Sequence, residues 1–170
     1  MVQKYSNLRV LEVFFKQPTS LHFVREISRE ISLAPTSVRN IINELLEQGL
    51  IKVKKSRPFN GYVADRENDF FIFSKKAFNL SSLYDLRAFI IESVHPSAII
   101  LFGSYSRGED VEGSDVDIVV VSKVRRQMNL EDFEKKLERK INIITVDSLK
   151  KLDERIVKKL YNGIVLQGEI

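Results

Sequence analysis

The sequence predicts a two-domain α/β protein, in which three helices and a β hairpin precede a small mixed sheet with flanking helices. Three observations predict this division. Apolar residues recur at helical spacing up to about Gln48, two alternating segments then meet around Asn60-Gly61, and helical and strand patterns alternate in the C-terminal half. We expect a first domain over residues 1–68, a helical linker over 69–82 and a second domain over 83–170.

The first domain should contain three helices. Residues 5–16 place apolar side chains on one helical face, residues 21–30 give a short second helix, and a third helix opens at Pro35 and runs to about Gln48. Gly49 is a helix stop, and the hairpin of residues 51–68 follows it.

The second domain should alternate helices and strands. A helical pattern over residues 70–94 is interrupted near residues 79–81. Strands are predicted at residues 97–103, 115–121 and 140–145, with a helix at 130–139 between the second and third. A last helix should cover Leu149 to Tyr161 with Asp147 near its cap, and residues 163–170 can add a short strand.

Composition excludes several classes of function. The 170 residues are 44% hydrophobic and 29% charged, as in ordinary proteins with compact cores. There is no cysteine, which excludes disulfides, thiolate zinc sites and a cysteine nucleophile, and two histidines are too few for a histidine metal cluster. No apolar run approaches the roughly 20 residues of a membrane-spanning helix, and no signal-peptide core is visible, so we expect a cytoplasmic protein with no membrane association.

The net positive charge of the protein comes from its N-terminal half. Residues 1–75 hold 12 Lys+Arg and 8 Asp+Glu, whereas residues 76–170 hold 15 of each, so the whole net charge of +4 belongs to the first half. A basic excess of this kind is compatible with a nucleic-acid partner.

Three helices followed by a hairpin resemble the winged helix-turn-helix regulators common in prokaryotes, over about residues 5–66. We expect double-stranded DNA as a partner, read in the major groove by the third helix and held at its phosphates by the basic hairpin. The candidate contacts are Thr36, Ser37, Arg39, Asn40 and Asn43 on the helix and Lys52, Lys54, Lys55 and Arg57 on the hairpin. The alternatives are solvated polar surfaces or a protein-interaction module. Paired half-sites would suit a homodimer.

The segment from Leu101 to Val121 carries the clearest chemistry. Asp115 and Asp117 open a buried strand and share one face, about 6.6 Å apart along it, so both can converge on a divalent cation. Gly103 and Ser104 end the preceding strand, and the backbone N–H groups there can face a phosphate. Arg107 lies one turn further on and can contact another phosphate. Taken singly, each has a structural alternative: a common Gly-Ser turn, a capping Asp115, or an ion pair between Asp117 and Arg107.

Gly103-Ser104, Arg107-Gly108 and Ser114-Asp115-Val116-Asp117 together resemble the signature of the polymerase-beta-type nucleotidyltransferases, in their minimal branch. The resemblance covers about residues 80–170 and implies that family's fold. It also implies metal-dependent transfer of a nucleoside monophosphate from a nucleoside triphosphate such as ATP. Asp115 and Asp117 would be the catalytic ligands of Mg²⁺ or Mn²⁺, and Gly103, Ser104, Arg107 and Ser114 would contact the nucleotide.

The family's third carboxylate is replaced here. The matching position on the later strand is Asn142, whose carbonyl can coordinate a metal weakly but whose amide cannot act as a general base. The working interpretation is a DNA-binding transcriptional regulator that carries a nucleotidyltransferase-like domain. The alternative is a catalytically impaired, nucleotide-sensing or antitoxin-like domain, for which a protein acceptor or a toxin would be the partner.

Overall fold

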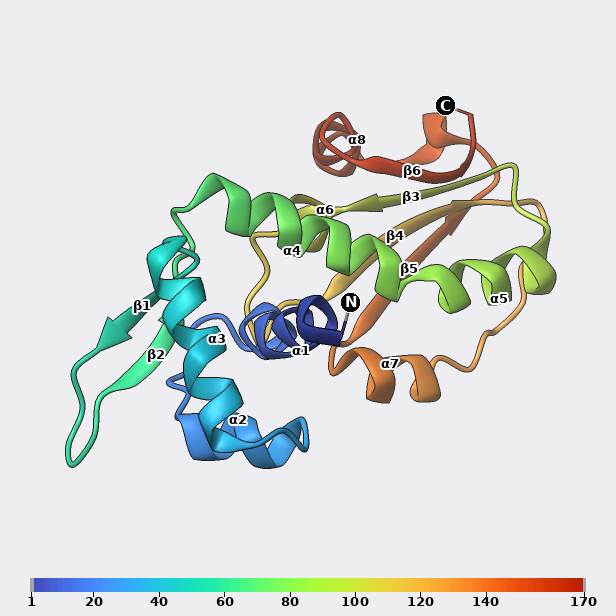
Figure 1. Cartoon of the computed structure of the whole chain (residues 1–170). Helices are drawn as coiled ribbons and strands as arrows, with labels where there is room; N and C mark the ends of the chain where they lie inside the picture. The colour runs from blue at the N-terminus through green and yellow to red at the C-terminus, as the bar shows by residue number, and fades with distance from the viewer. Residues whose placement is uncertain (1, 170) are drawn as a thin grey trace. The chain divides into compact units, whose positions relative to one another are not determined.

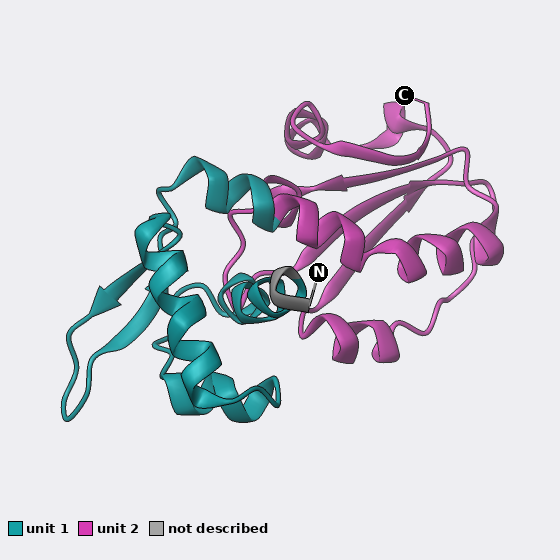
Figure 2. Ribbon diagram, in the orientation of Figure 1, with its two compact units in different colours: residues 1–75 teal, residues 76–170 magenta. Residues whose placement is uncertain are grey.

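The computed structural model describes residues 2–169 and divides the chain into two compact units, residues 1–75 and 76–170 (Figure 2). The division falls inside helix α4 (Asp69–Ser82), which covers the residues that the sequence predicts as a linker. Each unit has its own buried core. None of the helices in the described chain is both long and apolar enough to cross a membrane.

Unit 1 contains three helices and a hairpin in the predicted order (Figure 1). Its elements are α1 (Val2–Lys16), α2 (Val24–Glu30), α3 (Pro35–Glu47), β1 (Ile51–Lys54) and β2 (Gly61–Ala64). The two strands pair antiparallel, with Lys54 opposite Gly61. Phe14, Phe15 and Ile42 are among the fully buried side chains of its core, and burial of such apolar surface stabilises the unit.

The second helix begins later than predicted. Residues Leu21 and His22 are extended rather than helical, because the backbone of His22 pairs with that of Tyr62 through two N–H to carbonyl bonds of 2.9 Å. Asn60-Gly61 does not form the predicted tight turn either, since a longer loop joins β1 to β2. A Cβ on Gly61 would lie 2.5 Å from the Leu21 side chain, so this glycine permits the close approach of the extended segment.

Unit 2 is a four-stranded mixed sheet in the order β5-β4-β3-β6, with helices on both faces (Figure 1). Its strands are β3 (Ala98–Phe102), β4 (Val116–Val121), β5 (Ile141–Val146) and β6 (Ile164–Gly168). Strand β3 pairs antiparallel with β4 and β6, whereas β4 and β5 run parallel. The mixed α/β architecture that the sequence predicts is therefore confirmed for this unit.

The strand period of two sends alternate side chains to two separate cores. Ile99, Leu101 and Ile118 face α5 (Tyr84–Val94) and α7 (Glu131–Leu137). Ile100 and Val119 face the other side, where α8 (Glu154–Leu160) and the short 3₁₀ helix Leu149–Lys151 cover the sheet. The short α6 (Gly103–Arg107) follows β3 directly.

The prediction of one continuous last helix is wrong, because the segment is divided into the 3₁₀ helix Leu149–Lys151 and α8. Each piece has its own cap: the Ser148 hydroxyl accepts from the N–H of Lys150, and the Asp153 carboxylate accepts from that of Arg155 at 2.8 Å. A side-chain cap competes with helix continuation, which explains the interruption. Asp147 caps neither piece and instead forms an ion pair with Lys151 at 2.6 Å.

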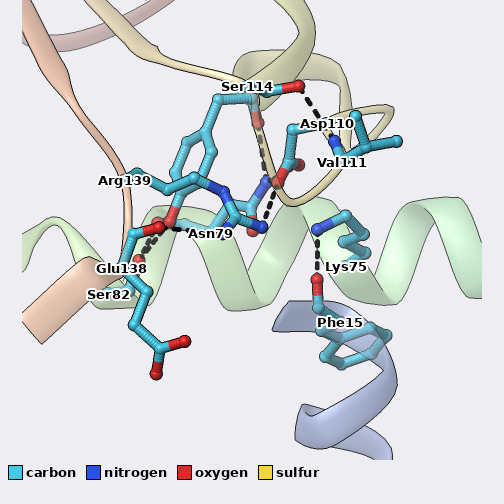
Figure 3. A network of polar contacts seen from close by, with 10 residues as sticks. Phe15, Lys75, Asn79, Ser82, Asp110, Val111, Ser114, Glu138 and Arg139 are labelled. Carbon is cyan, nitrogen blue, oxygen red and sulfur yellow. Dashed lines mark hydrogen bonds and ion pairs between the residues drawn. The ribbon is translucent and has the colours of Figure 1, made fainter. Parts of the chain in front are cut away.

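A buried polar network holds the loop between α6 and β4 (Figure 3). The carboxylate of Asp110 is fully buried and lies 3.5 Å from the guanidinium of Arg139, which is 4% exposed. The side-chain amide of Asn79 donates to Asp110 at 2.7 Å and to the carbonyl of Tyr105 at 2.9 Å. On the same helix, the buried Lys75 ammonium donates to the carbonyl of Phe15 within unit 1.

Removing one partner of the buried ion pair should destabilise unit 2 strongly. We expect Arg139→Met to lower the free energy of unfolding by about 3 kcal/mol, because the Asp110 carboxylate would stay buried without its counterion. Urea unfolding followed by circular dichroism measures this change. The exposed Lys159→Met is the matched control and should change the free energy by less than about 0.5 kcal/mol. Equal stability of the two variants would contradict a structural role for the pair.

Candidate active site

Asp115 and Asp117 lie at the N-terminal end of β4, on the sheet face that α8 also covers further along. Asp117 stands opposite Phe102 of β3 and Asn142 of β5, in the middle of three paired strands. Asp115 directly precedes the strand and is exposed, whereas Asp117 is half-buried. Asp117 lies beside the bend after β3, and both carboxylates lie within hydrogen-bonding distance of the Asn142 amide on β5.

The bend at Gly103 is built around the Asp117 carboxylate. Gly103 has a φ of +79°, a conformation that residues with a Cβ rarely adopt. A Cβ at this position would lie 2.7 Å from Oδ2 of Asp117, so the carboxylate occupies the space that any larger residue would need. The acid therefore points toward the bend and not away from it.

The other residues predicted to contact phosphates differ in exposure and in their hydrogen-bond partners. Arg107 is exposed, and its guanidinium donates to Glu109 at 2.7 Å and to the carbonyl of Gly103 at 3.0 Å, so it forms no ion pair with Asp117. The hydroxyl of Ser114 accepts from the N–H of Val111 at 2.9 Å and closes a turn just before Asp115. The Ser104 side chain is half-buried in α6.

Asn142 joins the two acids. Its Nδ2 donates to Oδ2 of Asp115 at 3.1 Å and to Oδ1 of Asp117 at 3.2 Å. The pairing follows from the parallel register of β4 and β5, which places Asn142 beside Asp117. From the sequence, the carbonyl of this residue is predicted to be a weak metal ligand, whereas in the structure its NH₂ group faces the carboxylates.

The two carboxylates suit a hard divalent cation, because Mg²⁺ prefers oxygen ligands and commonly completes its shell with water and substrate phosphates. Within residues 2–169, no group of three or more His, Cys, Asp or Glu residues is placed to hold a metal ion. A cation here would thus take Asp115 and Asp117 as its charged protein ligands and depend on other oxygens for the rest of its shell.

A cavity of about 510 Å³ opens beside Asp115, which the sequence analysis did not identify. Glu134 lines it and accepts from Lys140 at 2.8 Å and from the N–H of Ile141 at 3.0 Å, and these bonds lower the pKa of the Glu134 carboxyl. The hydrogen bond to Glu134 raises the pKa of the Lys140 ammonium. The acids at the start of α7 were the available signal, because Glu131 and Glu134 are three residues apart and therefore share one face of the helix.

Tyr105 and Ser106 lie within the Gly-Ser to Arg-Gly segment but are buried and serve the fold. Tyr105 is 4% exposed, its hydroxyl bonds to Ser82 at 2.9 Å, and burial raises its pKa to about 12. The hydroxyl of Ser106 donates to the carbonyl of Gly103 at 2.8 Å. Neither side chain is available to a nucleotide.

The predicted DNA-contact residues of unit 1 are on its surface. All of them are exposed except Ser37, which is half-buried. Lys52 is engaged by Asp65 at 2.9 Å and by Glu67 at 3.4 Å, which raises the pKa of its ammonium. Arg39 lines a cavity of about 560 Å³ together with Arg25 and Arg29 of α2, two cations that the sequence analysis missed because it considered only the third helix and the hairpin.

Replacing Gly103 should test whether the bend has room for a side chain. We expect Gly103→Ala to lower the free energy of unfolding by roughly 1–3 kcal/mol, because it combines an unfavourable positive φ with a contact on the Asp117 carboxylate. Gly113→Ala is the matched control, since nothing lies within 4 Å of an added Cβ there. Chemical denaturation of both variants measures the difference, and indistinguishable midpoints would contradict the close approach.

Comparison with known proteins finds a similarity that lies within the second unit. Residues 83–166 match the family described as the nucleotidyltransferase domain, a range that includes β3, α6, β4 and β5 and therefore the whole acid site. No curated protein matches the chain. Over residues 83–166, the second unit of this protein is thus similar to the nucleotidyltransferase domain family.

Proposed function

We propose that the domain of residues 83–166 transfers a nucleoside monophosphate from a nucleoside triphosphate to an acceptor, with a divalent cation held by Asp115 and Asp117. The observation that carries the proposal is the convergence of these two carboxylates on one amide, with Asp117 also facing the glycine bend. Like charges kept together at an exposed strand end are unfavourable without a compensating positive group. A cation bound with a polyphosphate satisfies that requirement.

The remaining residues of the bend would bind and orient the triphosphate. The backbone N–H groups of α6 and the Ser104 hydroxyl can donate to phosphate oxygens, and Arg107 can add a charge-assisted bond. Arg107 would first leave Glu109, and an exposed ion pair of this kind contributes less than about 1 kcal/mol. When bound, the cation would neutralise charge on the phosphates and favour the leaving of pyrophosphate.

Asn142 limits what the site can do. An amide brings no charge and cannot take the proton of an attacking hydroxyl, so one of the usual contributions to catalysis is missing. This residue favours slow transfer, and it is also the observation behind the second possibility, a domain that binds a nucleotide as a sensor or acts as an antitoxin-like partner. The two differ in whether the α-phosphate is ever transferred.

Transfer can be measured with nucleoside triphosphates labelled at the α-phosphate, Mg²⁺ or Mn²⁺, and protein and RNA fractions as acceptors. We expect label to appear on a macromolecule with the native chain and to fall at least tenfold with Asp115→Ala, because the cation loses a charged ligand. Asn142→Asp should increase the rate by roughly 10²-fold, since it supplies both a charge and a candidate base.

Lys159→Met serves as the control in this assay, because it is exposed on α8 and should leave the rate unchanged. Label that is equal in the native chain and in Asp115→Ala would rule out Asp115 as a cation ligand. Absence of transfer with the native chain, together with clear transfer by Asn142→Asp, would favour the sensor or antitoxin-like role.

We infer a second role for unit 1, namely binding of double-stranded DNA as a transcriptional regulator. The observation in its favour is the gathering of Arg25, Arg29 and Arg39 around one cavity, with the exposed Asn40 and Asn43 on the same helix as Arg39. Arginine suits phosphate oxygens and guanine edges, and asparagine suits adenine. This unit also carries the whole net positive charge of the protein.

Fluorescence anisotropy with a labelled duplex from the region upstream of the protein's own gene tests this role. We expect Arg25→Gln with Arg29→Gln to weaken binding to all duplexes and to reduce the slope of log affinity against log salt by about 2, one for each lost phosphate contact. Arg39→Ala should weaken the preferred duplex by about 1–3 kcal/mol and relax its sequence preference.

Lys159→Gln lies in unit 2 and serves as the matched loss of one charge. If binding survives Arg39→Ala combined with Lys54→Ala, the assigned reading surface is wrong. If no duplex binds at low salt, unit 1 has another role.

A further inference from the structure

The two acids of the candidate site share one amide, and the ammonium of Lys140, which is paired with Glu134, acts on Asp115 only through a longer-range electrostatic interaction. Within the part of the chain that the structure describes, no lysine or arginine forms an ion pair with Asp115 or Asp117. Both carboxylates instead accept from Nδ2 of Asn142, at 3.1 and 3.2 Å. The nitrogen is therefore nearly equidistant from the two acids, which is the position expected of a shared positive group.

The orientation of this amide is fixed by chemistry. An asparagine side chain offers two N–H donors at one end and a carbonyl acceptor at the other. Turning the carbonyl toward Asp115 and Asp117 would bring three oxygen acceptors together, whereas the NH₂ group provides one N–H for each carboxylate. The donor end thus faces the acids for as long as both are ionised and no cation lies between them.

We propose that Asn142 is an internal substitute for the metal ion, which holds the two carboxylates together when no cation is bound and must turn away or withdraw when one binds. The proposal builds on the cation site of the proposed function but concerns binding of the cation alone. Its consequence is that the amide competes with the metal. A cation arriving by itself has to break two hydrogen bonds, so the site favours uptake of the cation together with a triphosphate that supplies further oxygen ligands.

The two possible roles of Asn142, competitor and metal ligand, predict opposite effects of its removal on the affinity for the metal. If the Asn142 carbonyl were a ligand, Asn142→Ala would weaken metal binding. If the amide is a competitor, the same change leaves two unbalanced carboxylates and should strengthen it. We expect the dissociation constant for Mn²⁺ to fall by roughly three- to tenfold in Asn142→Ala, which is less than the full effect of two hydrogen bonds to charged groups because both bonds are exposed to solvent.

The experiment is a titration of the full chain with Mn²⁺, without nucleotide, followed by electron paramagnetic resonance of the free ion. Asn142→Val is the second test variant, since valine suits a strand, removes both the donor and the carbonyl, and should shift the constant in the same direction. Asn162→Ala is the control, an exposed asparagine outside the site that should leave the constant unchanged. Asp115→Ala should weaken binding in every background, which shows that the measured ion is at this site.

Thermal unfolding gives an independent measurement. At low ionic strength with a chelator present, Asn142→Ala should unfold at a lower temperature than the native chain, and saturating Mg²⁺ should raise its midpoint by more than that of the native chain. Unchanged or weaker Mn²⁺ binding in both Asn142→Ala and Asn142→Val would overturn the proposal. Because no triphosphate is used, the result stands apart from whether the domain transfers a nucleotide.

Discussion

Repulsion between two carboxylates on one face of β4 is the constraint that organises the candidate site. Asp115 and Asp117 are brought together by the strand period, and the neighbouring strands supply what keeps them there. On one side β3 is followed directly by Gly103, whose missing side chain leaves room for the Asp117 carboxylate. On the other side β5 provides Asn142, whose amide reaches both acids. The adjacent strands β3, β4 and β5 thus each lead to one part of the same electrostatic arrangement.

The exposed acids depend on a buried pair a few residues away. Asp110 precedes the turn that leads into β4, and Arg139 lies two residues before β5, so their contact connects the starts of the two parallel strands that carry the site. Asn79 completes the contact from α4 and also anchors the backbone of Tyr105 in α6. The geometry of the exposed site is therefore set by interactions that solvent does not reach, and its precision should be less sensitive to salt than a surface network.

Sequence patterns that span a few residues predicted the strands and the side chains that share a strand face, because these features depend on neighbouring residues. The apolar runs marked β3, β4 and β5, and the spacing of Asp115 and Asp117 predicted their common face. Contacts between distant residues had no such signal: Asn79, Asp110 and Arg139 meet only after the sheet has formed, and the direction of the Asn142 amide depends on its partners. The extended Leu21-His22 segment was missed for the same reason, since its partner lies in the hairpin. Binding of DNA by the first unit stays a prediction.

Helix α4 has a further consequence for dissecting this protein. Lys75 and Asn79 are separated by one helical turn, yet the first bonds to Phe15 in unit 1 and the second to Asp110 in unit 2 (Figure 3). A fragment that stops at residue 68 lacks the lysine, and a fragment that starts at residue 83 lacks the asparagine. A fragment of the first unit would therefore have to extend at least to Lys75, and a fragment of the second unit would have to begin before Asn79. The predicted linker thus contributes hydrogen bonds to both units.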